Sequence, residues 1–197
     1  MSTAASGRAV AGPGQYLTFH LSGEEYGIAI FKVREIVECT AVTRVPGTPR
    51  FIRGVLNLRG TVLPVVDLAV KLGLGDTAIT KWTCVVMVEV EWDGTRTTLG
   101  VMTDAMSRVL DLAATDLEPV PAFGVPVRLD YLLGMGRATE KFVLILDIDR
   151  VLSPEELAAV ASVEDPVAGD AAAVLPALHD LPGATSVRPD GAPSQKS

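Results

Sequence analysis

The sequence repeats itself at a nearly constant offset, and this duplication restricts the possible fold more than any single motif. Gly27-Ile28-Ala29-Ile30 matches Gly100-Val101-Met102-Thr103 at an offset of 73 residues. Further along, residues 51–55 match 131–135 and residues 62–68 match 142–148, both at an offset of 80. The sequence therefore predicts two copies of one unit that differ by seven residues in an inner loop.

Short apolar runs rich in β-branched residues make up each copy. Val55–Leu58 and Val62–Val66 are separated by Arg59-Gly60, and residues 83–90 and 95–102 flank a Trp-Asp-Gly turn. Two apolar runs joined by a tight, glycine-containing turn are typical of a β-hairpin. Because such runs are short and divided by frequent turns, the sequence predicts a mainly β fold in which each copy is a small barrel.

Only short helices are expected. Val33, Ile36 and Val37 have helix-like spacing within residues 31–38, and Leu68–Leu72 precedes Gly73, a residue that often ends a helix. A C-terminal helix is predicted after Ser153-Pro154-Glu155-Glu156, because serine caps, proline fits the first position and glutamate bonds back to the cap. Leu157 and Val160 would form the buried face of that helix.

Composition limits both the partners and the location. The 197 residues include 17 basic and 24 acidic ones, a net charge of −7, so nucleic acid is not expected to bind. No run reaches the ~20 apolar residues that span a bilayer, and the start lacks a signal peptide, so we expect a soluble, cytoplasmic protein without direct membrane insertion. Residues 1–14 and the Ala/Pro-rich residues 163–197 are predicted to be disordered arms.

The duplication separates architectural residues from functional ones. Gly54 and Gly134 occupy equivalent places in the two copies, as do Asp67 and Asp147 at the ends of apolar strands. We interpret these four residues as architectural, and the two aspartates as turn or cap residues that bond nearby backbone N–H groups.

Two features occur in one copy only. The offset of 80 places Thr139-Glu140 opposite Arg59-Gly60, and the offset of 73 places Arg108 opposite Glu35. An arginine held on a rigid hairpin turn presents a permanently charged fork at little cost in conformational freedom. Arg59 and Glu35 are therefore candidates for recognition of another molecule.

No catalytic, metal or cofactor site is expected. His20 and His179 are the only histidines, and Cys39 and Cys84 have no further cysteine or histidine at ligand spacing. We interpret His20 as a solvent-facing strand residue and the cysteines as small, buried, reduced side chains. No phosphate-binding loop or dinucleotide-binding glycine motif is present, so an enzyme has little support.

Several motifs resemble the CheW family of chemotaxis coupling proteins between about Gln15 and Leu157. They are Leu21-Ser22-Gly23-Glu24-Glu25-Tyr26-Gly27-Ile28-Ala29-Ile30, Val33-Arg34-Glu35-Ile36, Thr48-Pro49-Arg50-Phe51-Ile52-Arg53-Gly54-Val55, Asn57-Leu58-Arg59-Gly60 and Pro64-Val65-Val66-Asp67-Leu68.

The resemblance implies two intertwined SH3-like β-barrels with short helices and a C-terminal helix, within a CheW-like domain at residues 15–162. We expect the barrel subdomains at about 15–75, closed by the C-terminal helix, and at 80–150. It also implies a protein-binding surface at Arg59 of the Asn-Leu-Arg-Gly motif and Glu35 of the Val-x-Glu-Ile motif. Val33, Asn57 and Leu58 are expected at the same surface.

The implied function is that of a non-catalytic adaptor. Such a protein would couple the cytoplasmic tip of transmembrane chemoreceptors to the regulatory domain of a CheA-type histidine kinase, and would be recruited to receptor arrays. The alternative is a coupling protein of a non-flagellar pathway that controls pili, gliding or development. Ala69 departs from the family, which commonly has arginine after Asp-Leu.

Charge within one stretch supports an acidic partner. Residues 31–60 contain six basic and two acidic side chains in an otherwise acidic protein. Charge complementarity of this kind favours an acidic surface on the partner. We expect Arg44, Arg50 and Arg53 to be solvated side chains, and Arg59 to make the contact.

Overall fold

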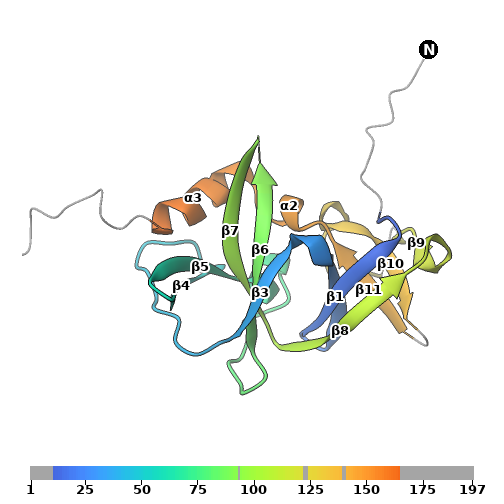
Figure 1. Ribbon diagram of the computed structural model, residues 1–197, viewed down its shortest axis with the longest axis horizontal. Coiled ribbons are helices and arrows are strands. Elements are labelled where there is room, and N and C mark those ends of the chain that lie inside the picture. Colours follow the sequence, from blue (N-terminus) through green and yellow to red (C-terminus); the bar gives the residue numbers. More distant parts are fainter. Residues whose placement is uncertain (1–10, 93, 122–123, 139–140, 165–197) are drawn as a thin grey trace, which may run out of the picture. The chain divides into compact units, whose positions relative to one another are not determined.

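Two β-sheets form the fold of the described residues (Figure 1). The computed structural model describes residues 11–92, 94–121, 124–138 and 141–164. The C-terminal arm from residue 165, the first ten residues and Thr139-Glu140 lie outside the described residues.

The first sheet has six strands in the order β8-β1-β2-β11-β10-β9. Their bounds are β1 Gly14–Leu21, β2 Glu24–Ala29, β8 Ala105–Leu112, β9 Leu117–Glu118, β10 Leu132–Ala138 and β11 Lys141–Leu146.

The second sheet has five strands in the order β3-β6-β7-β5-β4. Their bounds are β3 Val33–Glu38, β4 Ile52–Leu58, β5 Thr61–Asp67, β6 Cys84–Trp92 and β7 Thr95–Thr103. The α-helices are α1 Leu68–Leu72, α2 Ile148–Val151 and α3 Pro154–Glu164, and single 3-10 turns occur at Ile30–Lys32, Ala114–Asp116 and Leu129–Tyr131.

The two copies of the repeat exchange their first hairpins. By the sequence offsets, β1-β2 corresponds to β6-β7, β3 to β8, and β4-β5 to β10-β11. The β1-β2 hairpin nevertheless pairs with strands of the second copy, through parallel β2 and β11 on one side and β8 on the other. The β6-β7 hairpin pairs in the same way with β5 and β3 of the first copy.

This exchange confirms a mainly β fold of two intertwined halves, in which residues 15–75 and 80–150 each contribute strands to both sheets. Each sheet takes one hairpin from one copy and the remaining strands from the other. Neither stretch of sequence therefore contains a complete sheet. The order of β3-β6-β7-β5-β4 matches that of β8-β1-β2-β11-β10 strand for strand. The sequence repeat therefore corresponds to two sheets of the same topology.

The stretch 31–38 is where the secondary-structure prediction is wrong. After the 3-10 turn it forms β3, not a helix, and Ile36 pairs with Val86 of β6. Exposure alternates along β3, with Val33, Glu35 and Val37 half-buried. Backbone hydrogen bonds to β6 favour the extended conformation over a helix of one or two turns. The β-branched valines favour it as well.

A β-bulge recurs at the same place in both halves and accounts for Gly54. The register of β4 shifts between Ile52 and Gly54, and that of β10 shifts between Leu132 and Gly134. Gly54 has φ of +143°, and a Cβ there would lie 2.1 Å from the carbonyl oxygen of Thr43. The architectural interpretation of this glycine is confirmed.

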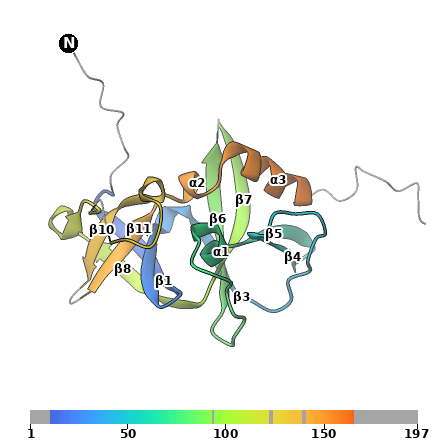
Figure 2. The ribbon, with the colours of Figure 1, turned by 180° about the vertical axis from the view of Figure 1, so that it is seen from behind.

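The C-terminal helix begins as predicted. The Ser153 Oγ accepts a hydrogen bond from the Glu156 N–H at 3.3 Å, and the Glu156 carboxylate accepts one from the Ser153 N–H at 2.7 Å. Leu157 and Val160 are buried in the main core. The same carboxylate binds the Lys71 ammonium at 2.6 Å, which ties α3 to α1. Figure 2 shows α1 and α3 from behind.

The N-terminal arm ends earlier than expected. Ala11 is buried, and its N–H donates to the Leu133 carbonyl oxygen at 3.1 Å. The Tyr16 hydroxyl donates to the Gly12 carbonyl oxygen at 2.5 Å. Residues 11–14 are therefore part of the packed fold.

Tyr26 is fully buried, and its hydroxyl has no hydrogen-bond partner among the described residues. Burial, with a smaller effect of Glu24, raises the pKa of Tyr26 from 10.0 to about 12. An unpaired buried hydroxyl destabilises a fold by about 1 kcal/mol or more. We expect Tyr26→Phe to raise the free energy of unfolding at pH 7 by about 1 kcal/mol.

The same variant is expected to change the alkaline pH dependence. Between pH 10 and 12 the unfolded chain releases the Tyr26 proton while the folded chain retains it, so wild-type stability falls as pH rises. Urea unfolding at pH 7 and pH 11 measures both effects. A variant less stable than wild type at pH 7 would show that the hydroxyl has a stabilising partner.

Candidate protein-binding site

The turn between β4 and β5 holds Arg59 in a fixed conformation. Arg59 has φ of +51° and Gly60 has φ of +86°, the positive values that a two-residue hairpin turn of type I′ requires. The Asn57 side-chain oxygen accepts a hydrogen bond from the Gly60 N–H at 3.0 Å. Asn57 therefore shapes the turn that carries Arg59.

The structure brings Arg59 and Glu35 together. Arg59 Nη2 lies 3.1 Å from Glu35 Oε1, although Arg59 is in the β4–β5 turn and Glu35 is in β3. The Arg59 side chain is 78% exposed and that of Glu35 is 37% exposed. An ion pair this exposed stabilises a fold by about 0–1 kcal/mol, so the fold does not depend on it.

A groove of about 350 Å³ lies beside this ion pair. We call it the Arg59 groove; its lining residues are Glu35, Leu58, Arg59, Thr61, Val62, Leu63, Met87 and Thr98. Leu58, Val62 and Met87 are half-buried, so they supply apolar surface that a partner can cover.

A second depression of about 440 Å³ adjoins the Arg59 groove, because Val62 lines both. It runs between the loop at Val45–Thr48 and the end of α3 at Val163. The apolar surface beside Arg59 thus extends toward the C-terminal helix.

Of the five predicted site residues, Arg59, Glu35 and Leu58 line the groove. Asn57 is exposed near the end of β4, whereas Val33 is half-buried and packs against the main core. The sequence prediction missed Met87 and Thr98. Met87 pairs directly with Glu35 across β3 and β6, a relation that only the strand register reveals.

The positive charge of residues 31–60 is largely paired. Lys32, Arg34, Arg50 and Arg53 each form an ion pair with a carboxylate outside this stretch. Arg53 lies 3.4 Å from the buried Asp67 carboxylate, so the expectation that Arg53 is merely solvated is wrong. Neighbouring carboxylates therefore offset most of the positive charge of this stretch.

Titratable side chains do not gather as at a metal centre. Among the described residues, no group of three or more His, Cys, Asp or Glu side chains could hold a metal ion. Cys39 and Cys84 are free and half-buried, and burial raises the pKa of both thiols. Within the described part of the chain, no helix is long and apolar enough to cross a membrane.

Comparison with known proteins identifies the family. Residues 15–156 match the CheW-like domain. The chain belongs to the CheW family. The chemotaxis protein CheW of Klebsiella aerogenes is 40% identical over 149 residues, which cover 76% of this chain and 87% of that protein.

Other CheW relatives agree with this assignment. The chemotaxis protein CheW of Helicobacter pylori is 32% identical and covers 72% of this chain and 82% of its own. Protein FrzA of Myxococcus xanthus is 30% identical, with coverage of 75% and 90%. The crystal structure of the scaffolding protein TtCheW from Thermoanaerobacter tengcongensis matches with a TM-score of 0.64 and 27% identity, over 79% of this chain and 96% of that one.

Proposed function

We propose that this chain is a non-catalytic coupling protein that binds a CheA-type histidine kinase and a chemoreceptor in chemotaxis arrays. The observation that supports it most directly is Arg59, an exposed arginine on a rigid turn beside an apolar groove. Membership of the CheW family, and relatives named chemotaxis protein CheW, support the pathway.

The Arg59 groove has the properties of a protein-binding surface. The turn fixes the backbone of Arg59, and its planar guanidinium can fork onto a carboxylate or onto the free carbonyls of a helix end. Glu35 holds it only through an exposed ion pair, which a partner carboxylate can replace. The half-buried Leu58, Val62 and Met87 would be desolvated by the same contact.

A second candidate is coupling in a pathway with a non-flagellar output. The match to protein FrzA, which does not have the name CheW, favours keeping this alternative. Both functions need the same groove. The higher identity to the CheW of Klebsiella aerogenes favours chemotaxis as the main proposal.

Reconstitution tests the proposal. The purified chain is mixed with a receptor cytoplasmic fragment and the CheA-type kinase of the same organism, and co-sedimentation and kinase autophosphorylation are measured. We expect the receptor to retain and activate the kinase only when the chain is present. If neither partner binds the chain, the proposed partners are wrong, and the kinase of another chemosensory pathway from the same organism is tested in the same way.

A further inference from the structure

A single lysine lies between two aromatic rings that the repeat makes equivalent. The Lys71 ammonium lies 5.1 Å from the ring centre of Phe51 and 5.8 Å from that of Tyr131. Phe51 and Tyr131 are related by the offset of 80. Their carbonyl oxygens accept hydrogen bonds from the N–H groups of Asp67 and Asp147, at 2.7 and 2.8 Å. Equivalent backbone contacts therefore position the two aromatic residues.

The residues that follow the two aspartates differ between the copies. The Asp67 carboxylate caps α1, as predicted, by accepting a hydrogen bond from the Val70 N–H at 3.2 Å. Lys71 comes next in α1, and the offset of 80 places the buried Val151 of α2 at the equivalent position. One lysine therefore contacts both rings, and the second copy has no counterpart to it.

The Lys71 ammonium is paired with the first turn of α3. The Lys71 side chain is 10% exposed, and its Nζ donates to the Glu156 carboxylate at 2.6 Å. The same carboxylate accepts from the Ser153 N–H at 2.7 Å, so it also closes the helix cap. Among the described residues, the ion pair between Lys71 and Glu156 is the one that joins α3 to the rest of the fold.

Apolar packing holds the remainder of α3. Leu157, Val160 and Val163 are buried, whereas the other described side chains of the helix are exposed or half-buried. Within the described residues, α3 contributes no backbone hydrogen bond to either sheet, so it can separate without breaking a strand pair. Segments with few buried contacts open at a lower free energy than the core does.

The far end of α3 belongs to the surface beside Arg59. Ser162 and Val163 line the depression whose other wall is the loop at Val45–Thr48, and Val62 connects that depression with the Arg59 groove. Figures 1 and 2 show α3 above β4 and β5, the strands that flank the Arg59 turn. If α3 separates from these strands, the depression loses one wall.

We propose that α3 opens and closes independently of the two sheets, and that the ion pair between Lys71 and Glu156 holds it closed. In the open form the Lys71 ammonium would remain beside the two rings without its carboxylate, and a half-buried charge without a partner is costly. The closed form completes the surface beside Arg59. This last step rests on the proposed coupling function, whereas the opening itself does not.

Hydrogen exchange of the full chain, without kinase or receptor, tests the opening. We expect the hydrogen-bonded amides of α3 to have protection factors at least tenfold lower than those of β5 and β11. Their exchange is also expected to depend less on urea, because a local opening exposes little surface. Lys71→Met keeps an unbranched side chain between the rings and removes the charge. It is expected to speed exchange in α3 about tenfold.

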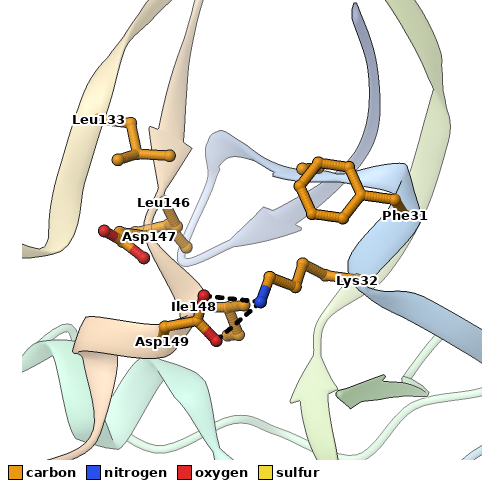
Figure 3. A pocket seen from close by; sticks show the side chains of 8 residues that line it. Phe31, Lys32, Leu133, Leu146, Asp147, Ile148 and Asp149 are labelled. Atoms are coloured by element: carbon orange, nitrogen blue, oxygen red, sulfur yellow. Dashed lines mark hydrogen bonds and ion pairs between the residues drawn. The ribbon is translucent and has the colours of Figure 1, made fainter. Parts of the chain in front are cut away.

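Lys32→Met is the matched control. Lys32 Nζ lies 2.7 Å from Asp149, and Figure 3 shows this ion pair, which lies outside α3. Opening of α3 leaves the Lys32 pair intact, whereas global unfolding breaks both pairs. Exchange in α3 should therefore stay within about twofold of wild type in Lys32→Met, even where loss of the pair speeds exchange in the sheets.

A second variant keeps the test valid if Lys71→Met does not fold. Glu156→Gln retains an oxygen that can accept from the Ser153 N–H, but it removes the charge that pairs with Lys71. We expect exchange in α3 to become about threefold faster or more. Exchange in α3 that matches the rates and urea dependence of β5 and β11, or that responds equally to Lys32→Met and Lys71→Met, would contradict an independent opening.

Addition of the kinase or the receptor fragment tests the last step. A partner that needs the closed form stabilises it, so exchange in α3 is expected to slow at least threefold in the complex. A partner that binds without slowing this exchange would show that α3 is not part of the binding surface. If no partner binds, the coupling function and this last step both fail, while exchange in the free chain still decides whether α3 opens.

Discussion

Replacing Arg59 by glutamate is expected to weaken binding of the chain to its kinase or receptor partner at least tenfold, equivalent to about 1.4 kcal/mol or more. The substitution removes the fork at the centre of the proposed contact and places a carboxylate opposite an acidic partner surface. Because the guanidinium is 78% exposed, loss of its ion pair with Glu35 is expected to lower the free energy of unfolding by no more than about 1 kcal/mol. Titration calorimetry and urea unfolding measure the two quantities.

Two further variants show whether Arg59 acts on the partner or only on Glu35. The double variant Arg59→Glu/Glu35→Arg restores an ion pair with the charges exchanged, and should not restore binding. Arg50→Glu is the matched control, because Arg50 is 74% exposed and paired with Asp76 but does not line the groove. Binding restored by the exchanged pair, or lost equally in Arg50→Glu, would contradict a specific role for Arg59.

Gly54→Ala is expected to destabilise the fold by about 3 kcal/mol or more, the largest effect on stability that we predict. The added Cβ would lie 2.1 Å from the Thr43 carbonyl oxygen, in a backbone conformation with φ of +143°. Thr43 pairs with Val55 through two backbone hydrogen bonds of 2.8 Å, so relieving the clash would break both. Urea unfolding of the purified variant measures the loss.

Gly60→Ala provides the control for this prediction. Gly60 also has positive φ, +86°, but a Cβ there meets no atom within 4 Å among the described residues. The expected cost is about 1 kcal/mol, from the backbone conformation alone. Equal destabilisation by the two substitutions would show that the clash at Thr43 is relieved without loss.

Local signals explain what was predictable from the sequence. The Arg59-Gly60 turn, the Ser153 cap and the end of α1 at Gly73 depend on residues close to one another in the chain, and the structure contains all three. The duplication added a nonlocal signal, since Gly54 is repeated at Gly134 and both follow a bulge.

Contacts between distant strands explain what was not predictable. The pairing of β3 with β6 made a strand from residues expected to be helical, and brought Met87 beside Glu35. The sequence repeat does not reveal that the hairpins are exchanged. The apolar pattern of a hairpin would be the same whether it paired with strands of its own copy or of the other copy. The ion pair between Arg53 and the buried Asp67 likewise depends on the pairing of β4 with β5, which the sequence alone does not place.

The exchanged hairpins also determine how the two copies of the repeat are held together. Two halves that each formed their own sheet would be joined by one covalent segment and could swing about it. Here two parallel strand pairs, β2 with β11 and β5 with β7, join the two copies. The turn that carries Arg59 leads into β5, and the far end of β5 pairs with β7 of the other copy, so the proposed binding surface is built on strands that both copies hold in place.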